Sequence, residues 1–154
     1  MVMAYLQIRA SRIIAAADFL LKLESRFCSI EMVKKRKKFM QILKDAPEDY
    51  ERMDAFRDVF DFFEDLGLLL RKGIIPKDLV WSDYCHWILN YWIAFQGYIN
   101  WARKKDDDPT LYCEFETLFK RIRGYEERRI KRKVRITPEK TKEFINDELQ
   151  LLSC

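Results

Sequence analysis

The stretch from Tyr84 to Ala102 runs for nineteen residues without an Asp, Glu, Lys or Arg, although 35% of the whole chain is charged. Seven of these nineteen residues are aromatic. Since an aromatic side chain carries roughly 150–250 Å² of surface, exposing all seven would place on the order of 1,000 Å² of apolar surface in water. A monomer tolerates an exposed apolar patch of only a few hundred Å². We therefore expect this stretch to lie in a core or an interface.

Length and composition favour a single all-α domain. The chain has 154 residues, of which 49% are hydrophobic, and this size is typical of one compact domain spanning residues 1–154. Four Gly and four Pro are too few for a chain of tight hairpins. The Lys, Glu, Leu and Arg content suits long helices.

Apolar residues at helical spacing predict a bundle of five or six helices. The expected helices cover about residues 4–27, 30–43, 48–72, 76–104 and 109–125, with a last one after Thr137. Ser29 is placed to cap the second helix, and Gly73 to end the third. The short turn after Gly73 predicts a long antiparallel hairpin of 48–72 and 76–104. The core bundle would span about 4–125, followed by a basic tract and a C-terminal helical arm at about 126–154.

The residue types that carry chemistry are too scattered to predict an enzyme. Cys28, Cys85, Cys113 and Cys154 contain no C-x-x-C pair, and His86 is the one histidine of the sequence. We therefore expect no catalytic residue, no metal, no cofactor and no small-molecule substrate. Cysteines in this pattern are typical of reduced thiols, which predicts an intracellular, cytoplasmic location.

The helix expected at 76–104, which we call the window helix, has an unusual composition on one side. If its aromatic side faces the core, the opposite side presents uncharged residues, where a solvated face normally carries charges. One interpretation is a central helix covered on both sides by its own chain. The other is an interface with a protein partner or a second copy, because interface cores favour such residues. The candidate interface residues are His86, Leu89, Ile93, Gln96 and Asn100.

Two basic tracts offer an alternative partner. The net charge of +4 is too small to indicate nucleic-acid binding by itself, so only local clusters argue for polyanions. The tracts could bind phosphates of RNA or DNA, contact an anionic membrane surface, or simply face water. Their residues are Lys34, Lys35, Arg36, Lys37 and Lys38 in the first tract, and Arg128, Arg129, Lys131, Arg132, Lys133 and Arg135 in the second.

Most of the chain resembles a known family. The resemblance rests on the run from Phe62 to Gly73, FFEDLGLLLRKG, on Leu79-Val80-Trp81, and on WILNYW at 87–92. It is similar to an uncharacterised family of small, mostly bacterial, all-helical proteins catalogued as a domain of unknown function, and it covers about residues 12–125. Many members begin with a membrane-spanning helix, which this sequence lacks, so the resemblance does not imply membrane anchoring here. It implies no catalytic residues.

These observations lead to two functional hypotheses. The first is a non-catalytic interaction or accessory protein of a larger intracellular assembly, which self-associates through the aromatic-rich helix 76–104. The alternative is a polyanion-binding protein that uses the basic tracts at 34–38 and 128–135.

Overall fold

The computed structural model describes the backbone of residues 2–151, and the side chains of this range except those of residues 2–6 and 9. Within this range the chain forms helices and no strand, which confirms the all-α prediction. The end of the predicted arm, with Cys154, lies outside the described residues. The helices are α1 (Val2–Phe27), α2 (Ile30–Asp45), α3 (Tyr50–Asp54), α4 (Asp58–Arg71), α5 (Lys77–Ala94), α6 (Gln96–Lys105), α7 (Cys113–Ile130) and α8 (Pro138–Gln150).

The two long helices predicted at 48–72 and 76–104 are each broken, so this part of the prediction is wrong. The first is divided into α3 and α4 by a tighter turn, in which the N–H of Phe56 bonds to the carbonyl of Met53, three residues back. The second is divided at Phe95, whose φ of −115° and ψ of 16° are not helical. This break buries Phe95 against Phe39 and Phe60. The short helices α3 and α6 on the far sides of these breaks bury Met53 and Tyr98, respectively.

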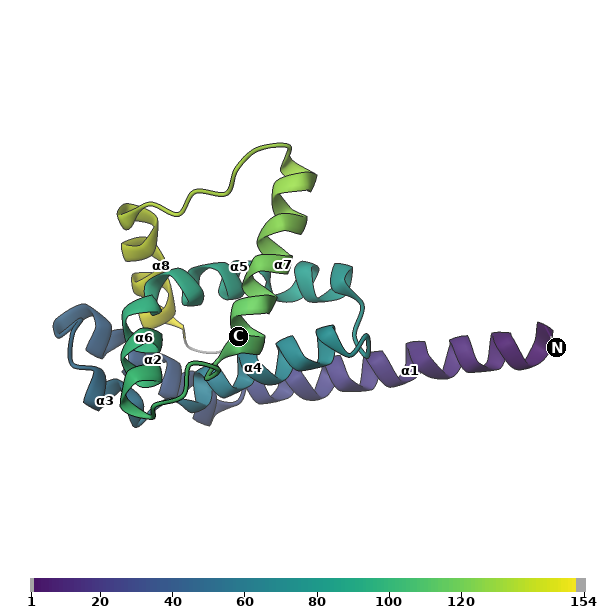
Figure 1. The fold of residues 1–154 in the computed structure, drawn as a ribbon, viewed down its shortest axis with the longest axis horizontal. Coiled ribbons are helices and arrows are strands. Elements are labelled where there is room, and N and C mark those ends of the chain that lie inside the picture. Colours follow the sequence, from purple (N-terminus) through teal and green to yellow (C-terminus); the bar gives the residue numbers. More distant parts are fainter. Residues whose placement is uncertain (1, 152–154) are drawn as a thin grey trace.

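Helix α7 supplies most of the packing between α4 and α5. These two helices run in opposite directions in Figure 1, joined by the turn at 72–76, but each contacts α7 far more extensively than the other. Phe115 on α7 stacks on Phe63 of α4, with ring centroids 4.7 Å apart. Phe119, one turn further, stacks on Trp92 of α5 at 5.5 Å. The core is therefore a three-helix contact rather than a simple hairpin.

The crossing of α4 and α7 depends on a close backbone approach. A Cβ atom on Gly67 would lie 2.4 Å from the carbonyl oxygen of Glu114, so only glycine fits there without a shift of the backbone. Glu64, one turn earlier, accepts hydrogen bonds from the N–H groups of Glu114 (3.2 Å) and Phe115 (2.7 Å). Its carboxylate thus supplies acceptors for the first turn of α7, which has no side-chain cap of its own.

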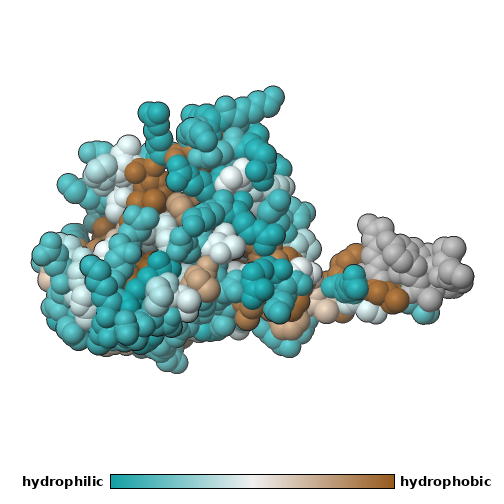
Figure 2. Space-filling view, viewed as in Figure 1, coloured by the Kyte–Doolittle hydropathy of each residue, from teal (hydrophilic) through white to brown (hydrophobic). Residues whose placement is uncertain are grey.

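The N-terminal half of α1 projects away from the rest of the molecule (Figure 1). The other half is seated by Leu23 and Phe27, which are buried, and by an ion pair of Arg26 with Asp65 at 2.6 Å. Figure 2 shows hydrophobic residues on the projecting part. Large apolar side chains of α1 remain exposed, with exposed fractions of 54% for Ile8, 63% for Ile13, 69% for Ile14 and 66% for Leu21. In the described part of the chain, none of the helices combines the length and the hydropathy needed to cross a membrane.

The chain after α7 forms an arm, which we define as residues 131–151. It turns at Lys131, where φ is 54°, runs without regular structure to Thr137 and ends with α8. The Thr137 hydroxyl accepts the N–H of Lys140 at 3.4 Å and caps α8. Helix α8 packs against α2 and α5. The arm therefore covers the side of α5 that faces away from α4.

Candidate functional site

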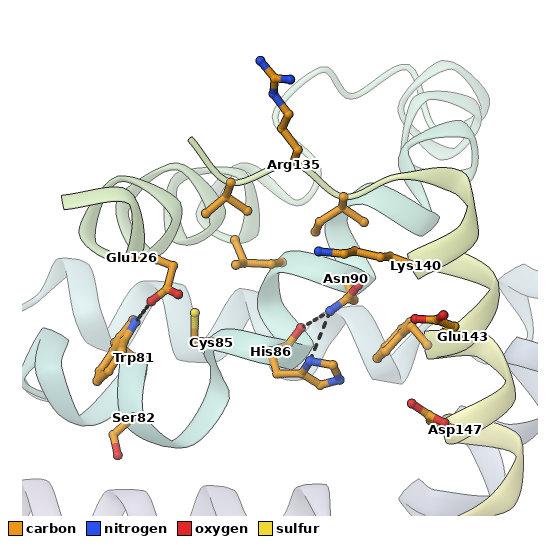
Figure 3. Close-up of a pocket in the computed structure, with 14 residues that line it drawn as sticks. Trp81, Ser82, Cys85, His86, Asn90, Glu126, Arg135, Lys140, Glu143 and Asp147 are labelled. Atoms are coloured by element: carbon orange, nitrogen blue, oxygen red, sulfur yellow. Dashed lines mark hydrogen bonds between the residues drawn. The ribbon is translucent and has the colours of Figure 1, made fainter. Parts of the chain in front are cut away.

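A cavity of about 590 Å³ lies between α5 and the arm, and it has the size of a small-ligand site. Figure 3 shows residues of α5, of the end of α7 and of the arm, including α8, around it. The Trp81 indole N–H donates to Glu126 at 2.6 Å, and this bond links α5 to the end of α7. The side chain of Lys140 lies across the cavity, whereas that of Arg135 points away from it. The lining thus mixes charges of both signs with aromatic surface.

Neither His86 nor Cys85 in this cavity is arranged for catalysis. The described contacts of His86 are with Trp87, Asn90 and Phe144, none of which is a nucleophile or a carboxylate that would orient a general base. Burial raises the pKa of the Cys85 thiol to about 12, so the reactive thiolate is scarce at neutral pH. Across the described residues, no three His, Cys, Asp or Glu side chains group as metal ligands would.

The structure divides the five candidate interface residues into two sets. Leu89 is buried, and Ile93 is half-buried beside Val134 and Ile136 of the arm. Leu89 and Ile93 are thus covered by their own chain, which is the interior interpretation rather than the interface one. His86 is exposed at the mouth of the cavity. The remaining two, Gln96 and Asn100, lie exposed on α6, beyond the break at Phe95.

Leu89→Ala is expected to lower the free energy of unfolding by about 2 kcal/mol, because it removes buried apolar contact between α5 and the arm. Gln96→Ala, on the exposed continuation of the same face, is the matched control and is expected to change stability by less than about 0.5 kcal/mol. Urea denaturation of both variants measures the difference. An equally small effect of both substitutions would mean that the arm is not seated on α5.

A buried ion pair fastens α8 to the rest of the molecule. The guanidinium of Arg36 and the carboxylate of Glu148, which are 0% and 3% exposed, are joined by two hydrogen bonds of 2.6 and 2.9 Å. The same carboxylate accepts the Tyr91 hydroxyl at 2.7 Å and the Trp87 indole N–H at 3.0 Å. Arg36 also lies 3.9 Å above the ring of Phe27 and donates to its carbonyl. Three helices, α2, α5 and α8, therefore meet at this carboxylate, and Arg36 connects them to α1 through Phe27.

Burial and hydrogen bonding within this network change the pKa of Arg36 and of Tyr91. Burial works most strongly against the charge of Arg36, but its hydrogen bonds to Glu148 and its electrostatic interactions with Tyr91 and Glu148 together outweigh burial and raise its pKa. Burial raises the pKa of the Tyr91 hydroxyl well above its usual value, and the neighbouring carboxylate adds to this rise. These shifts keep Arg36 charged and Tyr91 neutral, as expected of a structural ion pair rather than a proton-transfer site.

The sequence analysis missed this network, although a signal for it exists. Arg36 follows Met32 and Val33 and precedes Phe39 and Met40, so it stands on the apolar stripe of its helix. Glu148 likewise continues the stripe of Phe144 and Ile145. A charged residue at a core position of each of two helices is what a buried pair requires.

The first basic tract is not a free cationic surface. Arg36 is buried, so its assignment to a polyanion-binding tract is wrong. Lys35 pairs with Asp58 and Glu31, and Lys37 donates to the carbonyl of Leu151 at 3.0 Å. Among the residues of this tract, the exposed ones are Lys34 and Lys38.

The second basic tract is exposed but lies apart from the first. Arg129 lies 4.2 Å above the ring of Trp81, and Lys133 pairs with Glu127 at 3.6 Å. The exposed remainder consists of Arg128, Lys131, Arg132 and Arg135. This tract spans the last turn of α7 and the start of the arm, whereas the first lies on α2, and Figure 1 shows these segments well separated. The two tracts therefore do not form one phosphate-binding surface.

The fold and these surfaces define an all-helical protein with a closed core, an arm that covers α5 and a projecting N-terminal helix. The chain belongs to the family described as Domain of unknown function (DUF4760), whose model matches residues 1–122. This confirms the predicted membership of an uncharacterised family. The match spans α1 to most of α7, and the arm lies outside it. No curated protein and no solved structure matches the chain.

Proposed function

We propose that this chain is a non-catalytic interaction protein that binds a protein partner through the projecting helix α1. The observation that carries the proposal is the exposure of Ile8, Ile13, Ile14 and Leu21 on one helix, each more than half accessible to water. Scattered exposed apolar residues are ordinary, but Ile14 and Leu21 lie within about 20° of each other around a helix of 3.6 residues per turn. They form one apolar side of the projecting helix, which gains free energy when covered.

The energetics support docking through α1 rather than through α5. Covering a mostly exposed Ile or Leu contributes on the order of 1–2 kcal/mol, so burial of Ile14 and Leu21 offsets part of the entropy cost of association. The self-associating surface expected on helix 76–104 offers less, because Leu89 is already buried and Ile93 half-buried by the arm. The intracellular, cytoplasmic setting expected from the cysteines stays a prediction.

Photo-crosslinking in cells tests the proposal on the full chain. A photoreactive amino acid at Ile14 is expected to give a covalent adduct with a protein, and the same group at exposed Asp83 on α5 serves as the control. The adduct from Ile14 should disappear when Leu21→Lys is added, because a cation on the same helix opposes apolar docking. Lipid adducts alone, or no adduct from Ile14, would contradict the proposal.

A further inference from the structure

One face of α1 has the pattern of a helix-pairing seam. Ala10, Ile14, Ala17 and Leu21, which we call the α1 seam, follow one another at spacings of four, three and four residues, as the core positions of a heptad do. All four are exposed. At 3.6 residues per turn they occupy a sector of about 60° on the helix surface. The seam is uncharged, and Gln7 and Glu24 hold the next positions at its two ends.

The seam faces away from the chain's own core. Ala16, Leu23 and Phe27, which are buried, point to a side of α1 that lies about 130° around the helix from the centre of the seam. Ile14 and Leu21 therefore do not lie at the margin of the surface that packs against the core. It is a second apolar side of the same helix, which needs a separate occupant.

We propose that the α1 seam pairs with the α1 seam of a second copy of this chain, in an antiparallel helix pair. This deepens the proposed function and rests on it. A two-fold axis halfway between Ile14 and Ala17 places Ile14 of one copy opposite Ala17 of the other. The same axis places Leu21 opposite Ala10, so each large side chain meets a small one. The seam is thus complementary to itself, as a two-fold symmetric interface requires.

The antiparallel arrangement also explains what lies at the ends of the seam. The same axis brings Gln7 of one copy opposite Glu24 of the other, so an amide donor meets a carboxylate where the apolar contact stops. A parallel pair would instead stack Ile14 on Ile14 and Ala10 on Ala10, which alternates crowded and empty layers. It would also bring both cores to the same end of the pair, since each core is attached to the C-terminal half of α1 (Figure 1).

The size of the seam sets the expected strength of association. From Gln7 to Glu24 the helix rises about 26 Å, at 1.5 Å per residue. A single helix pair of this length lies at the low end of specific interfaces. We therefore expect a reversible dimer that dissociates on dilution, rather than a permanent one.

Sedimentation velocity of the full chain over a wide range of concentrations tests the pairing. The chain is expected to pass from monomer to dimer as the concentration rises. Leu21→Lys and Ala10→Glu, each alone, should weaken dimerisation at least tenfold, whereas Ala15→Lys, exposed on α1 but outside the seam, should leave it unchanged. Circular dichroism checks that helicity is retained in each variant. A chain that stays monomeric, or a dimer that ignores the seam substitutions, overturns the proposal.

Mixing the two variants tests the orientation. In an antiparallel pair, Lys at 21 of one copy faces Glu at 10 of the other, and the second layer keeps its native Leu and Ala. An equimolar mixture of Leu21→Lys and Ala10→Glu should therefore recover dimerisation that neither variant shows alone. A parallel pair places these charges at opposite ends of the contact, so a mixture without recovery overturns the antiparallel pairing.

The crosslink from Ile14 separates this inference from the proposed function. An adduct of twice the mass of the chain supports both. An adduct with a different protein, with the chain monomeric in sedimentation, overturns the pairing and keeps the proposed function. Seam-dependent binding of the monomer to anionic phospholipid vesicles, without a protein adduct, overturns both.

Discussion

Arg36→Met is expected to lower the free energy of unfolding by about 3–5 kcal/mol, because it leaves the carboxylate of Glu148 buried without a cation. The donors that remain, the Tyr91 hydroxyl and the Trp87 indole N–H, are neutral and cannot replace the guanidinium. Lys38→Met, in the same basic tract but exposed, is the matched control and is expected to stay within about 0.5 kcal/mol. Urea denaturation followed by far-UV circular dichroism measures both.

A double substitution separates the unpaired charge from lost packing. Arg36→Met combined with Glu148→Gln removes both charges and leaves an amide oxygen that can accept from Tyr91 and Trp87. The double variant is expected to be more stable than Arg36→Met alone, because a buried neutral amide costs less than a buried unpaired carboxylate. If the double variant is less stable than Arg36→Met, the loss comes from packing and the charge argument is wrong.

Gly67→Ala is expected to destabilise the protein by about 3 kcal/mol, because the new methyl group would overlap backbone atoms of Glu114 at the crossing of α4 and α7. Backbone cannot move aside as a flexible side chain can, so the two helices must separate. Gly124→Ala on α7 is the control, since the nearest atom to its Cβ position is the end of the Arg128 side chain at 3.6 Å. There the helix propensity of alanine should raise stability by up to about 1 kcal/mol.

The two glycine substitutions are expected to change the free energy of unfolding in opposite directions, which separates close packing from helix propensity. Propensity alone predicts that both substitutions stabilise a helix. Thermal or urea denaturation that finds Gly67→Ala as stable as the parent would mean that α4 and α7 do not approach as closely as described. Equal destabilisation by both would point to a general intolerance of the helices rather than to the crossing.

The sequence predicted local structure well where the signal is local. Ser29 caps α2 as expected, with its hydroxyl accepting the N–H of Met32 at 3.1 Å, and Thr137 caps α8. Gly73 adopts the left-handed φ of 69° after the end of α4. The helix expected from about residue 109 begins later, at Cys113, because Tyr112 has a φ of 60° and interrupts it. Caps, turns and helical periods depend on neighbours within one or two turns, so one segment of sequence contains them.

The candidate surfaces were predicted less well, because they depend on distant segments. The uncharged face of the window helix was recognised as unusual, but its cover comes from Val134 and Ile136, more than forty residues after Leu89. Likewise, α1 was recognised as amphipathic, yet Ile8 and Ile13 of its apolar side are exposed, because the N-terminal half of the helix extends beyond the core. Periodicity identifies an apolar side without stating what, if anything, covers it.

The sequence by itself determined that this chain is all-helical, where helices such as α2 and α8 begin, and that the segment from Tyr84 to Ala102 is largely buried. The tertiary structure alone decided that Arg36 belongs to the core and not to a basic surface. Its partner Glu148 is 112 residues away, and a charge is stable in an apolar interior only where such a partner meets it. The local pattern places Arg36 on the apolar stripe of its helix, but only the long-range contact with Glu148 decides that the arginine is buried rather than solvated.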